Sequence, residues 1–277
     1  MKLSLTNYSN RRQRIITGLV GAILMLLACV YNEWTYFLVF FIICGATVLE
    51  FYNLSRFDGV ICSKLIGTVI SMYIYSLTFL VEKGILSSYT YLSIFPIIVL
   101  LFINKLYRKE EKPFTNIAYT LFGIVYVGLP FALLNLCVFS SGQYDYEIPI
   151  GLLIILWAYD TGAYFIGVKF GRRRLFKRIS PRKSWEGFVG GFILALIFTT
   201  IVGYYFMTMS LLEWYIFSVI VVVAGTYGDL VESLFKRSID IKDSGKTIPG
   251  HGGFLDRFDG LLLAIPFILF YLKVILV

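Results

Sequence analysis

Apolar stretches of about twenty residues recur along nearly the whole chain, and they restrict its fold more than any other feature. A helix needs about 20 mostly apolar residues to cross a bilayer. Of the 277 residues, 58% are hydrophobic and 15% are charged, and the mean hydropathy is +0.79, well outside the averages of soluble domains. The chain is therefore predicted to be an all-α, polytopic integral membrane protein.

About nine transmembrane helices are predicted from these stretches. They are expected at residues 15–31, 34–54, 65–81, 89–106, 117–139, 148–168, 188–208, 211–233 and 259–277. Because the spans leave no room for a separate soluble domain, residues 1–277 are predicted to form a single transmembrane domain. Residues 1–140 would be mainly scaffold and lipid-facing helices, and residues 148–277 would carry the polar, catalytic segments.

The loops that carry basic residues predict the orientation, because cytoplasmic loops have an excess of lysine and arginine. With the N-terminus in the cytoplasm, the dense groups Lys169–Lys183 and Lys236–Arg257 fall inside, while Lys83 and Lys273 fall outside. The N-terminus is therefore predicted to be cytoplasmic. The net charge of +8 belongs to loops beside membrane lipids, so no nucleic-acid partner is predicted.

The first polar cluster begins inside the sixth predicted span and continues into a strongly basic loop. Asp160 lies within the span, where a charged side chain costs roughly 2.5 to 3.5 kcal/mol and usually faces a polar cavity and a partner. A structural ion pair is the alternative interpretation. Downstream, Ser180 opens a predicted turn, and Ser184 and Glu186 lie near the start of the next helix.

The start of that next helix is a candidate anion site. Its backbone N–H groups and positive dipole end suit a nucleotide phosphate, and Lys183 would strengthen the attraction. The basic run at residues 172–178 is also consistent with ordinary loop charge that contacts anionic lipid headgroups. The residues of this cluster predicted to bind substrate are Asp160, Ser180, Lys183, Ser184 and Glu186.

The second polar cluster, at residues 228–260, combines a helix face with a polar loop. Asp229, Glu232, Ser233 and Lys236 follow i, i+3, i+4, i+7 spacing. This spacing places two carboxylates, a hydroxyl and an amine on one side of a helix. One polar face at a cytoplasmic helix end is predicted to form a wall of the site.

Two more carboxylates, Asp256 and Asp259, follow the loop at the start of the last helix. The carboxylates of the two helices can converge only if the helices pack together. Converging carboxylates provide the oxygen ligands that Mg²⁺ prefers, and Asp229 and Asp256 are the preferred ligands, with a second metal left open. Helix caps and surface ion pairs are the alternative interpretation of these side chains.

His251 is the only histidine of the sequence and lies in a Pro-Gly-His-Gly-Gly segment. The neighbouring glycines give a ligand access to the backbone. No second histidine or cysteine accompanies it, so phosphate contact or an orienting hydrogen bond is favoured over metal ligation.

At this second cluster the sequence resembles the phosphatidate cytidylyltransferase family, also called the CDP-diacylglycerol synthases. The residues that match the family signature in type and spacing are Ser233, Lys236-Arg237, Lys242-Asp243, Gly245, Ile248-Pro249, His251-Gly252-Gly253, Asp256-Arg257 and Asp259. The Asp-Thr-Gly-Ala-Tyr segment that starts at Asp160 and the Ser-Pro-Arg-Lys-Ser-Trp-Glu-Gly segment that starts at Ser180 are also similar to the family.

The resemblance implies an all-helical membrane enzyme, dimeric, whose aspartates matching Asp229 and Asp256 bind the catalytic metal. The residues implied in catalysis are Asp229, Lys236, Arg237, Lys242, Asp243, His251, Asp256, Arg257 and Asp259. Those implied in substrate contact within the signature are Ser233, Gly252 and Gly253.

The expected reaction is the Mg²⁺-dependent transfer of CMP from CTP to phosphatidic acid, which gives CDP-diacylglycerol and pyrophosphate. The phosphate of phosphatidic acid would attack the α-phosphorus of CTP, while basic side chains offset the crowded negative charge. The expected location is a bacterial inner membrane, with the active site facing the cytoplasm.

Two other functions are compatible with parts of the pattern. A CTP-dependent kinase of polyprenol or another lipid alcohol would also need basic residues and magnesium, but it would release CDP. A transporter of an anionic solute could use Asp160 and the basic loops. The lack of a convincing internal repeat and the loop position of most polar groups count against the transporter.

Overall fold

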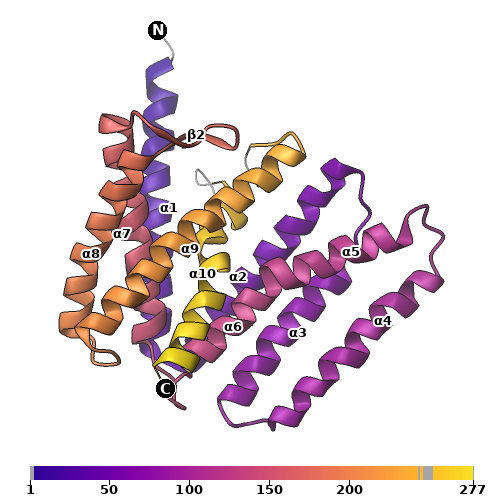
Figure 1. The fold of residues 1–277 in the computed structure, drawn as a ribbon. Coiled ribbons are helices and arrows are strands. Elements are labelled where there is room, and N and C mark those ends of the chain that lie inside the picture. Colours follow the sequence, from indigo (N-terminus) through magenta and orange to yellow (C-terminus); the bar gives the residue numbers. More distant parts are fainter. Residues whose placement is uncertain (1–2, 243, 246–251, 277) are drawn as a thin grey trace. The chain divides into compact units, whose positions relative to one another are not determined.

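The computed structural model describes residues 3–242, 244–245 and 252–276, and of residues 3–16, 56 and 57 it describes the backbone alone. The chain divides into two compact units. The N-terminal unit comprises Met1–Asn135 and Asp243–Arg257, and the C-terminal unit comprises Leu136–Lys242 and Phe258–Val277. Each unit is built almost entirely from helices (Figure 1).

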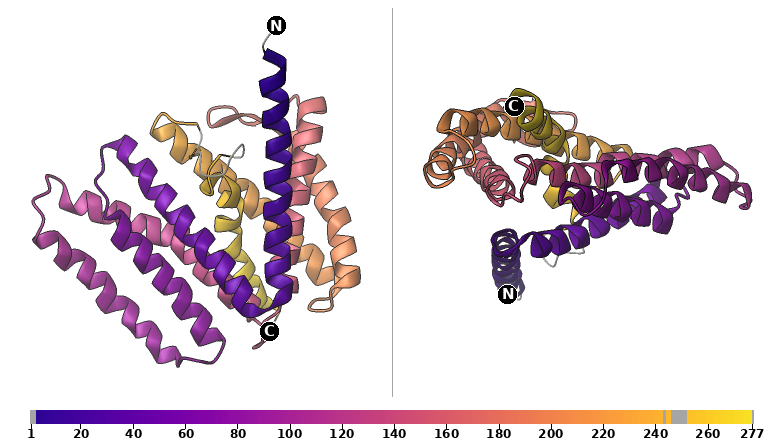
Figure 2. Two further views of the ribbon diagram at one scale, coloured as in Figure 1. Left: turned by 180° about the vertical axis from the view of Figure 1, so that it is seen from behind. Right: turned by 90° about the horizontal axis from the view of Figure 1, so that it is seen from below.

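The N-terminal unit contains the first helices of the chain. They are α1 (Leu3–Tyr31), α2 (Glu33–Leu54), the short η1 (Ser55–Asp58), α3 (Lys64–Glu82), η2 (Ser88–Ser93), α4 (Ile94–Leu106), α5 (Pro113–Gly123), the π-helical η3 (Ile124–Gly128) and the beginning of α6 (Leu129–Val138). α1 and α2 form a V, as Figure 2 shows, and Asn32 is the one residue between them in the sequence. The side chain of Asn32 caps α2 by accepting hydrogen bonds from the N–H groups of Trp34 and Thr35, both at 2.9 Å.

Tyr52 of α2 fills a space that two glycines leave between helices of the N-terminal unit. A Cβ atom added at Gly67 of α3 or at Gly123 of α5 would lie 2.6 Å from Cζ of Tyr52, closer than real side chains approach. The Tyr52 hydroxyl donates a hydrogen bond to the carbonyl oxygen of Thr120 at 2.6 Å. Close contact between α2, α3 and α5 therefore depends on the large side chain of Tyr52 and on glycine, which has no side chain, at positions 67 and 123.

The C-terminal unit pairs long helices with a small hairpin. Its elements are α7 (Glu147–Phe170), β1 (Arg174–Phe176), β2 (Ser180–Ser184), α8 (Trp185–Tyr205), α9 (Leu211–Ser238), the main part of α10 (Leu255–Phe270) and the π-helical η4 (Tyr271–Ile275). The strands β1 and β2 are antiparallel. α7 and α8 lie side by side with glycines at their contact, because a Cβ at Gly162 would lie 2.9 Å from Cα of Gly191.

The prediction of an all-α polytopic membrane protein is confirmed. Within the described residues, eight helices are long and apolar enough to span a membrane, and a shorter apolar helix covers Thr17–Tyr31. Together they correspond to the nine predicted spans. Several helices are longer than those spans, because a helix does not have to end where its apolar stretch ends; α9, for instance, continues to Ser238.

Two details of the basic loop differ from the sequence prediction. The loop contains the hairpin β1–β2, and the turn lies at residues 177–179, so that Ser180 begins a strand instead of opening a turn. Local sequence was misleading because the proline after Ser180 normally marks a turn, yet proline is also tolerated in an edge strand. The cytoplasmic position of the N-terminus and the single catalytic domain stay predictions.

Candidate active site

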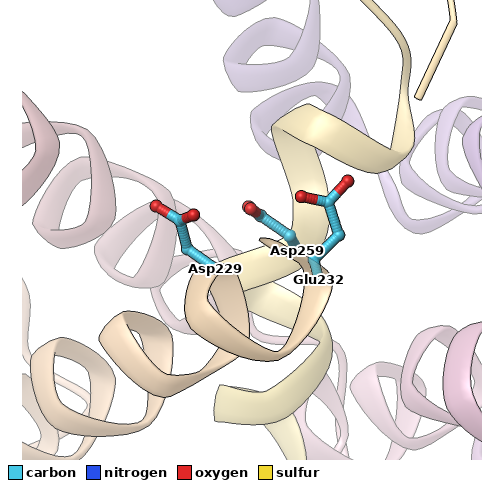
Figure 3. A group of neighbouring side chains, drawn as sticks. All are labelled: Asp229, Glu232 and Asp259. Atoms are coloured by element: carbon cyan, nitrogen blue, oxygen red, sulfur yellow. The ribbon is translucent and has the colours of Figure 1, made fainter. Parts of the chain in front are cut away.

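Three carboxylates converge where α9 and α10 cross in the C-terminal unit. Asp229 and Glu232 come from α9, and Asp259 comes from α10. One oxygen from each carboxylate lies within 4.8 Å of the others, and Figure 3 shows the three groups on the same side of the two helices. Glu232 is buried, while Asp229 and Asp259 are partly exposed. We call these three residues the carboxylate cluster.

Glycines let the two helices approach closely enough to form this cluster. A Cβ added at Gly228 of α9 would lie 2.9 Å from Cα of Gly260 on α10, and one at Gly225 would lie 3.7 Å from the Gly260 carbonyl oxygen. Side chains at these points would push the backbones apart. The helix packing that convergence of these carboxylates requires is therefore present, and it begins next to Asp229 and Asp259.

Two lysines balance part of the negative charge. Lys183 of β2 forms an ion pair with Asp229, and Lys236 of α9 forms one with Glu232 one turn away. The Glu232 side chain is 0% exposed and that of Lys236 is 11% exposed. A buried carboxylate needs such a partner, because an uncompensated charge in a low-dielectric interior is strongly destabilising.

Further polar side chains surround the carboxylate cluster. The Ser233 hydroxyl donates to Oδ1 of Asp229 at 3.3 Å. Asp160 of α7 is exposed and interacts electrostatically with Asp259. Next to it, the hydroxyls of Tyr159 and Thr226 are hydrogen-bonded at 2.7 Å, which joins α7 to α9. Polar residues of the first cluster therefore meet those of α9 and Asp259, from the second cluster, in the C-terminal unit.

Other predicted residues of the basic loop make backbone hydrogen bonds. Ser184 is the N-cap of α8, and its Oγ accepts a hydrogen bond from the Gly187 N–H at 3.1 Å. The Glu186 carboxylate accepts hydrogen bonds from the N–H groups of Arg172 and Arg173 at 3.0 and 3.1 Å. These contacts hold the hairpin at the start of α8, next to the position of Lys183. Their predicted contact with substrate stays a prediction.

The signature residues at the end of α9 are less enclosed. Nη1 of Arg237 donates to the carbonyl oxygen of Ile241 at 2.9 Å, which steadies the chain after the helix. Lys242 and Arg257 are exposed. The predictions for Asp243 and His251 fall outside the described residues.

Asp256 belongs to the N-terminal unit and stabilises the polar loop there. Its carboxylate accepts hydrogen bonds from the N–H groups of Ser244 and Gly253, both at 3.1 Å. Gly252 has a φ of +87°, a conformation that glycine adopts without strain. The metal role predicted for the pair of Asp229 and Asp256 stays a prediction.

The sequence prediction gave no catalytic, substrate-binding or metal role to two acidic residues, Glu232 and Glu50. Glu232 was predicted only as part of the polar face of its helix that forms a wall of the site, and the structure brings it into the carboxylate cluster. Glu50 of α2 contacts the polar loop in the N-terminal unit. The available signal for Glu50 was a single acidic residue inside an apolar span.

Comparison with known proteins assigns the chain to a family. The profile described as "Cytidylyltransferase family" matches residues 12–275. A Bacillus subtilis protein named phosphatidate cytidylyltransferase is 32% identical over 269 residues, which cover 94% of this chain and 97% of that relative. Proteins of the same name from Staphylococcus haemolyticus and Staphylococcus aureus are 38% and 36% identical over 160 residues, 57% of this chain and 60% of each relative. As the resemblance around the second polar cluster predicts, the chain belongs to the cytidylyltransferase family of nucleotidyltransferase enzymes.

Proposed function

We propose that this protein is a phosphatidate cytidylyltransferase, which transfers CMP from CTP to phosphatidic acid and releases pyrophosphate. The observation that carries the proposal is the carboxylate cluster paired with Lys183 and Lys236. Acidic groups that can hold a metal, next to cations that can bind phosphate, suit nucleotidyl transfer. The names of the relatives from Bacillus and Staphylococcus support the choice of lipid substrate.

The carboxylate cluster would hold Mg²⁺. Magnesium takes oxygen ligands and usually keeps several waters and substrate phosphates beside one or two carboxylates. Asp229 and Asp259, which are partly exposed, fit this requirement better than the buried Glu232. Asp256 remains a proposed ligand as well, and a second metal would use the remaining carboxylates. A bound Mg²⁺ would neutralise charge on the phosphate oxygens.

The lysines would act through the phosphates that they attract. Lys183 and Lys236 are held by carboxylates, so their ammonium groups are oriented before substrate arrives. A phosphate oxygen of phosphatidic acid would form a bond to the α-phosphorus of CTP, and the bond to the β-phosphate would break with pyrophosphate as the leaving group. Alignment and charge neutralisation are the main contributions expected of the protein.

The proposed setting is a bacterial inner membrane, with the carboxylate cluster and the basic hairpin on the cytoplasmic side, where CTP is available. The acyl chains of phosphatidic acid would remain in the lipid. We further propose that residues 1–277 act as one catalytic domain and that the protein forms a homodimer.

The test uses purified protein in detergent with phosphatidic acid, CTP labelled at its α-phosphate, and Mg²⁺. Label in the lipid extract, with pyrophosphate release and loss of both on chelation, is the expected result. Label in CDP together with a phosphorylated lipid alcohol would replace the proposal by a lipid kinase. Unchanged CTP, with anion uptake into proteoliposomes, would replace it by a transporter.

A further inference from the structure

Glu50 is a buried acidic residue in the apolar helix α2, and it binds the polar loop of the N-terminal unit. The residue is 5% exposed. Its carboxylate accepts hydrogen bonds from the Ser244 hydroxyl and from the N–H groups of Phe254 and Leu255, the latter two at 3.0 and 3.3 Å. A charge within an apolar span is costly unless it is compensated. These donors provide the compensation, and they come from both ends of one loop.

Two glycines of the family signature leave room for this carboxylate. A Cβ atom added at Gly245 would lie 3.0 Å from Cδ of Glu50, and one added at Gly253 would collide with Oε1 of Glu50 and Oγ of Ser244. Neither position has a positive φ, so backbone conformation does not demand glycine there. The close approach of Glu50 is a physical reason for glycine at both positions.

Asp256 connects the same two ends of the loop by separate hydrogen bonds. It accepts from the N–H groups of Ser244 and Gly253, while Glu50 accepts from Ser244, Phe254 and Leu255. Leu255 is the first residue of α10, so Glu50 satisfies an N–H group that a helix start leaves without an intrahelical partner. Glu50 and Asp256 therefore bind the same two ends of the loop, and Glu50 also binds the start of the helix that carries Asp256.

We propose that Glu50 is a positioning residue of the cytidylyltransferase: it joins residues 244–245 to residues 253–255 and thereby holds Asp256 and the start of α10 in place. Its effect on turnover rests on the proposed function, whereas its effect on the loop does not. In this proposal Glu50 acts through residues of the signature segment, Ser244 and Gly253 to Leu255, that surround its carboxylate.

The first measurement is the rate of tryptic cleavage after the exposed Lys242 in the intact protein in detergent, followed by mass spectrometry. Glu50→Gln replaces one oxygen by an amide group that cannot accept from an N–H donor, so we expect cleavage to become several-fold faster. Thr47→Val is the matched control, since the Thr47 hydroxyl is buried one turn away on α2 and donates to the Ile43 carbonyl of the same helix. This variant is expected to cleave at the wild-type rate.

The second measurement is the steady-state formation of CDP-diacylglycerol. Glu50→Gln is expected to lower kcat by about 10-fold or more, because it weakens hydrogen bonds to a charged group. The KM for phosphatidic acid is expected to stay nearly unchanged. Glu50→Asp keeps the charge and is expected to recover part of kcat. Ser244→Ala alone should lower kcat. In the double variant with Glu50→Gln it should cause little further loss, because the two residues act through the same hydrogen bond.

The outcomes separate this proposal from the proposed function. Wild-type cleavage and wild-type kcat in Glu50→Gln would overturn the positioning role. If Glu50→Gln does not fold, Ser244→Ala tests the positioning role instead, because it removes one donor to Glu50 and leaves α2 intact. Unchanged cleavage and unchanged kcat in Ser244→Ala would then overturn the positioning role of Glu50. If the wild-type protein makes no CDP-diacylglycerol, the proposed function fails, and the cleavage rates still test Glu50.

Discussion

Lys183 and Asp229 form an ion pair between the basic hairpin and helix α9. The two residues come from the two separate polar clusters of the sequence. Both side chains are partly exposed, at 25% and 37%, so the pair faces solvent and a phosphate group can reach it. The contact therefore brings the basic loop to the carboxylate cluster.

Replacement of Lys183 tests this contact. We expect Lys183→Ala to lower kcat/KM for CTP by about 10- to 100-fold, the range for a lost charge-assisted contact with a phosphate. Lys183→Arg should retain more activity because it keeps the charge. Lys177→Ala is the control, as Lys177 is exposed in the turn of the same hairpin. Equal losses in the alanine variants of Lys183 and Lys177 would show that loop charge in general matters, and not this pair.

Replacement of Asp259 tests the metal site. Asp259→Asn is expected to lower kcat by at least about 100-fold and to shift Mg²⁺ activation to higher concentration, because a neutral amide is a weaker ligand for the metal. The measurement is turnover over a Mg²⁺ series. Asp240→Asn, in the exposed loop after α9, should behave like the wild type. A normal Mg²⁺ curve for Asp259→Asn would remove Asp259 from the metal site.

The buried pair of Glu232 and Lys236 predicts a stability effect. Lys236→Met leaves Glu232 without this cation, which costs roughly 3–5 kcal/mol for a buried pair, so we expect a clear fall in Tm in detergent. The double variant Glu232→Gln with Lys236→Met should recover much of the Tm without recovering activity. If the double variant is as unstable as the single one, the ion pair is not the cause.

The glycine crossing of α9 and α10 predicts that Gly228→Ala is harmful. Its Cβ would lie 2.9 Å from Cα of Gly260, so the helices must separate and the carboxylates with them. Both Tm and Mg²⁺-dependent activity should fall. Gly21→Ala is the control, because no atom lies within 4 Å of a Cβ at that position, and it should leave both quantities unchanged. A Gly228→Ala variant with normal Tm and activity would contradict the close crossing.

Glu110, in the loop between α4 and α5, predicts a pH effect. Burial raises the pKa of its carboxyl, but hydrogen bonds from Lys105 and Asn116 outweigh burial and lower the pKa below the ordinary 4.5. A carboxyl whose pKa is lowered by folding stabilises the folded protein at every pH above its ordinary pKa. This contribution is lost as the pH falls below the ordinary pKa and through the lowered one.

The corresponding variant is Glu110→Gln. Its Tm should lie below that of the wild type at pH 7, and the difference should shrink as the pH falls below 4.5. Glu111→Gln, at the exposed neighbouring position, should follow the wild type throughout. A Tm difference that stays constant with pH would exclude the charge of Glu110 as its cause.

The sequence alone predicted the helices well because membrane spanning requires a local property, a long apolar stretch. Helix ends were less predictable, since polar residues can continue a helix beyond the apolar core. The hairpin was missed because its strands are only 3 and 5 residues long, and because proline at position 181 resembled a turn signal.

Within the site, helical spacing predicted that Asp229 and Glu232 lie on one face of their helix. Asp259 joins them only because α9 and α10 pack together, which spacing within one helix does not reveal. Glu50 could not be found in the same way. Its partners lie far along the chain, and two of them are backbone N–H groups. Nearly every residue type has such a group, so the sequence does not show which residues donate.

Tyr52 has a consequence for how this family can change. Because its ring takes the space of the missing side chains at Gly67 and Gly123, the three positions share a fixed volume. A larger side chain at either glycine is tolerated only together with a smaller side chain at position 52. Substitutions at these sites are thus expected to be inherited together, so that helices α2, α3 and α5 evolve as one group.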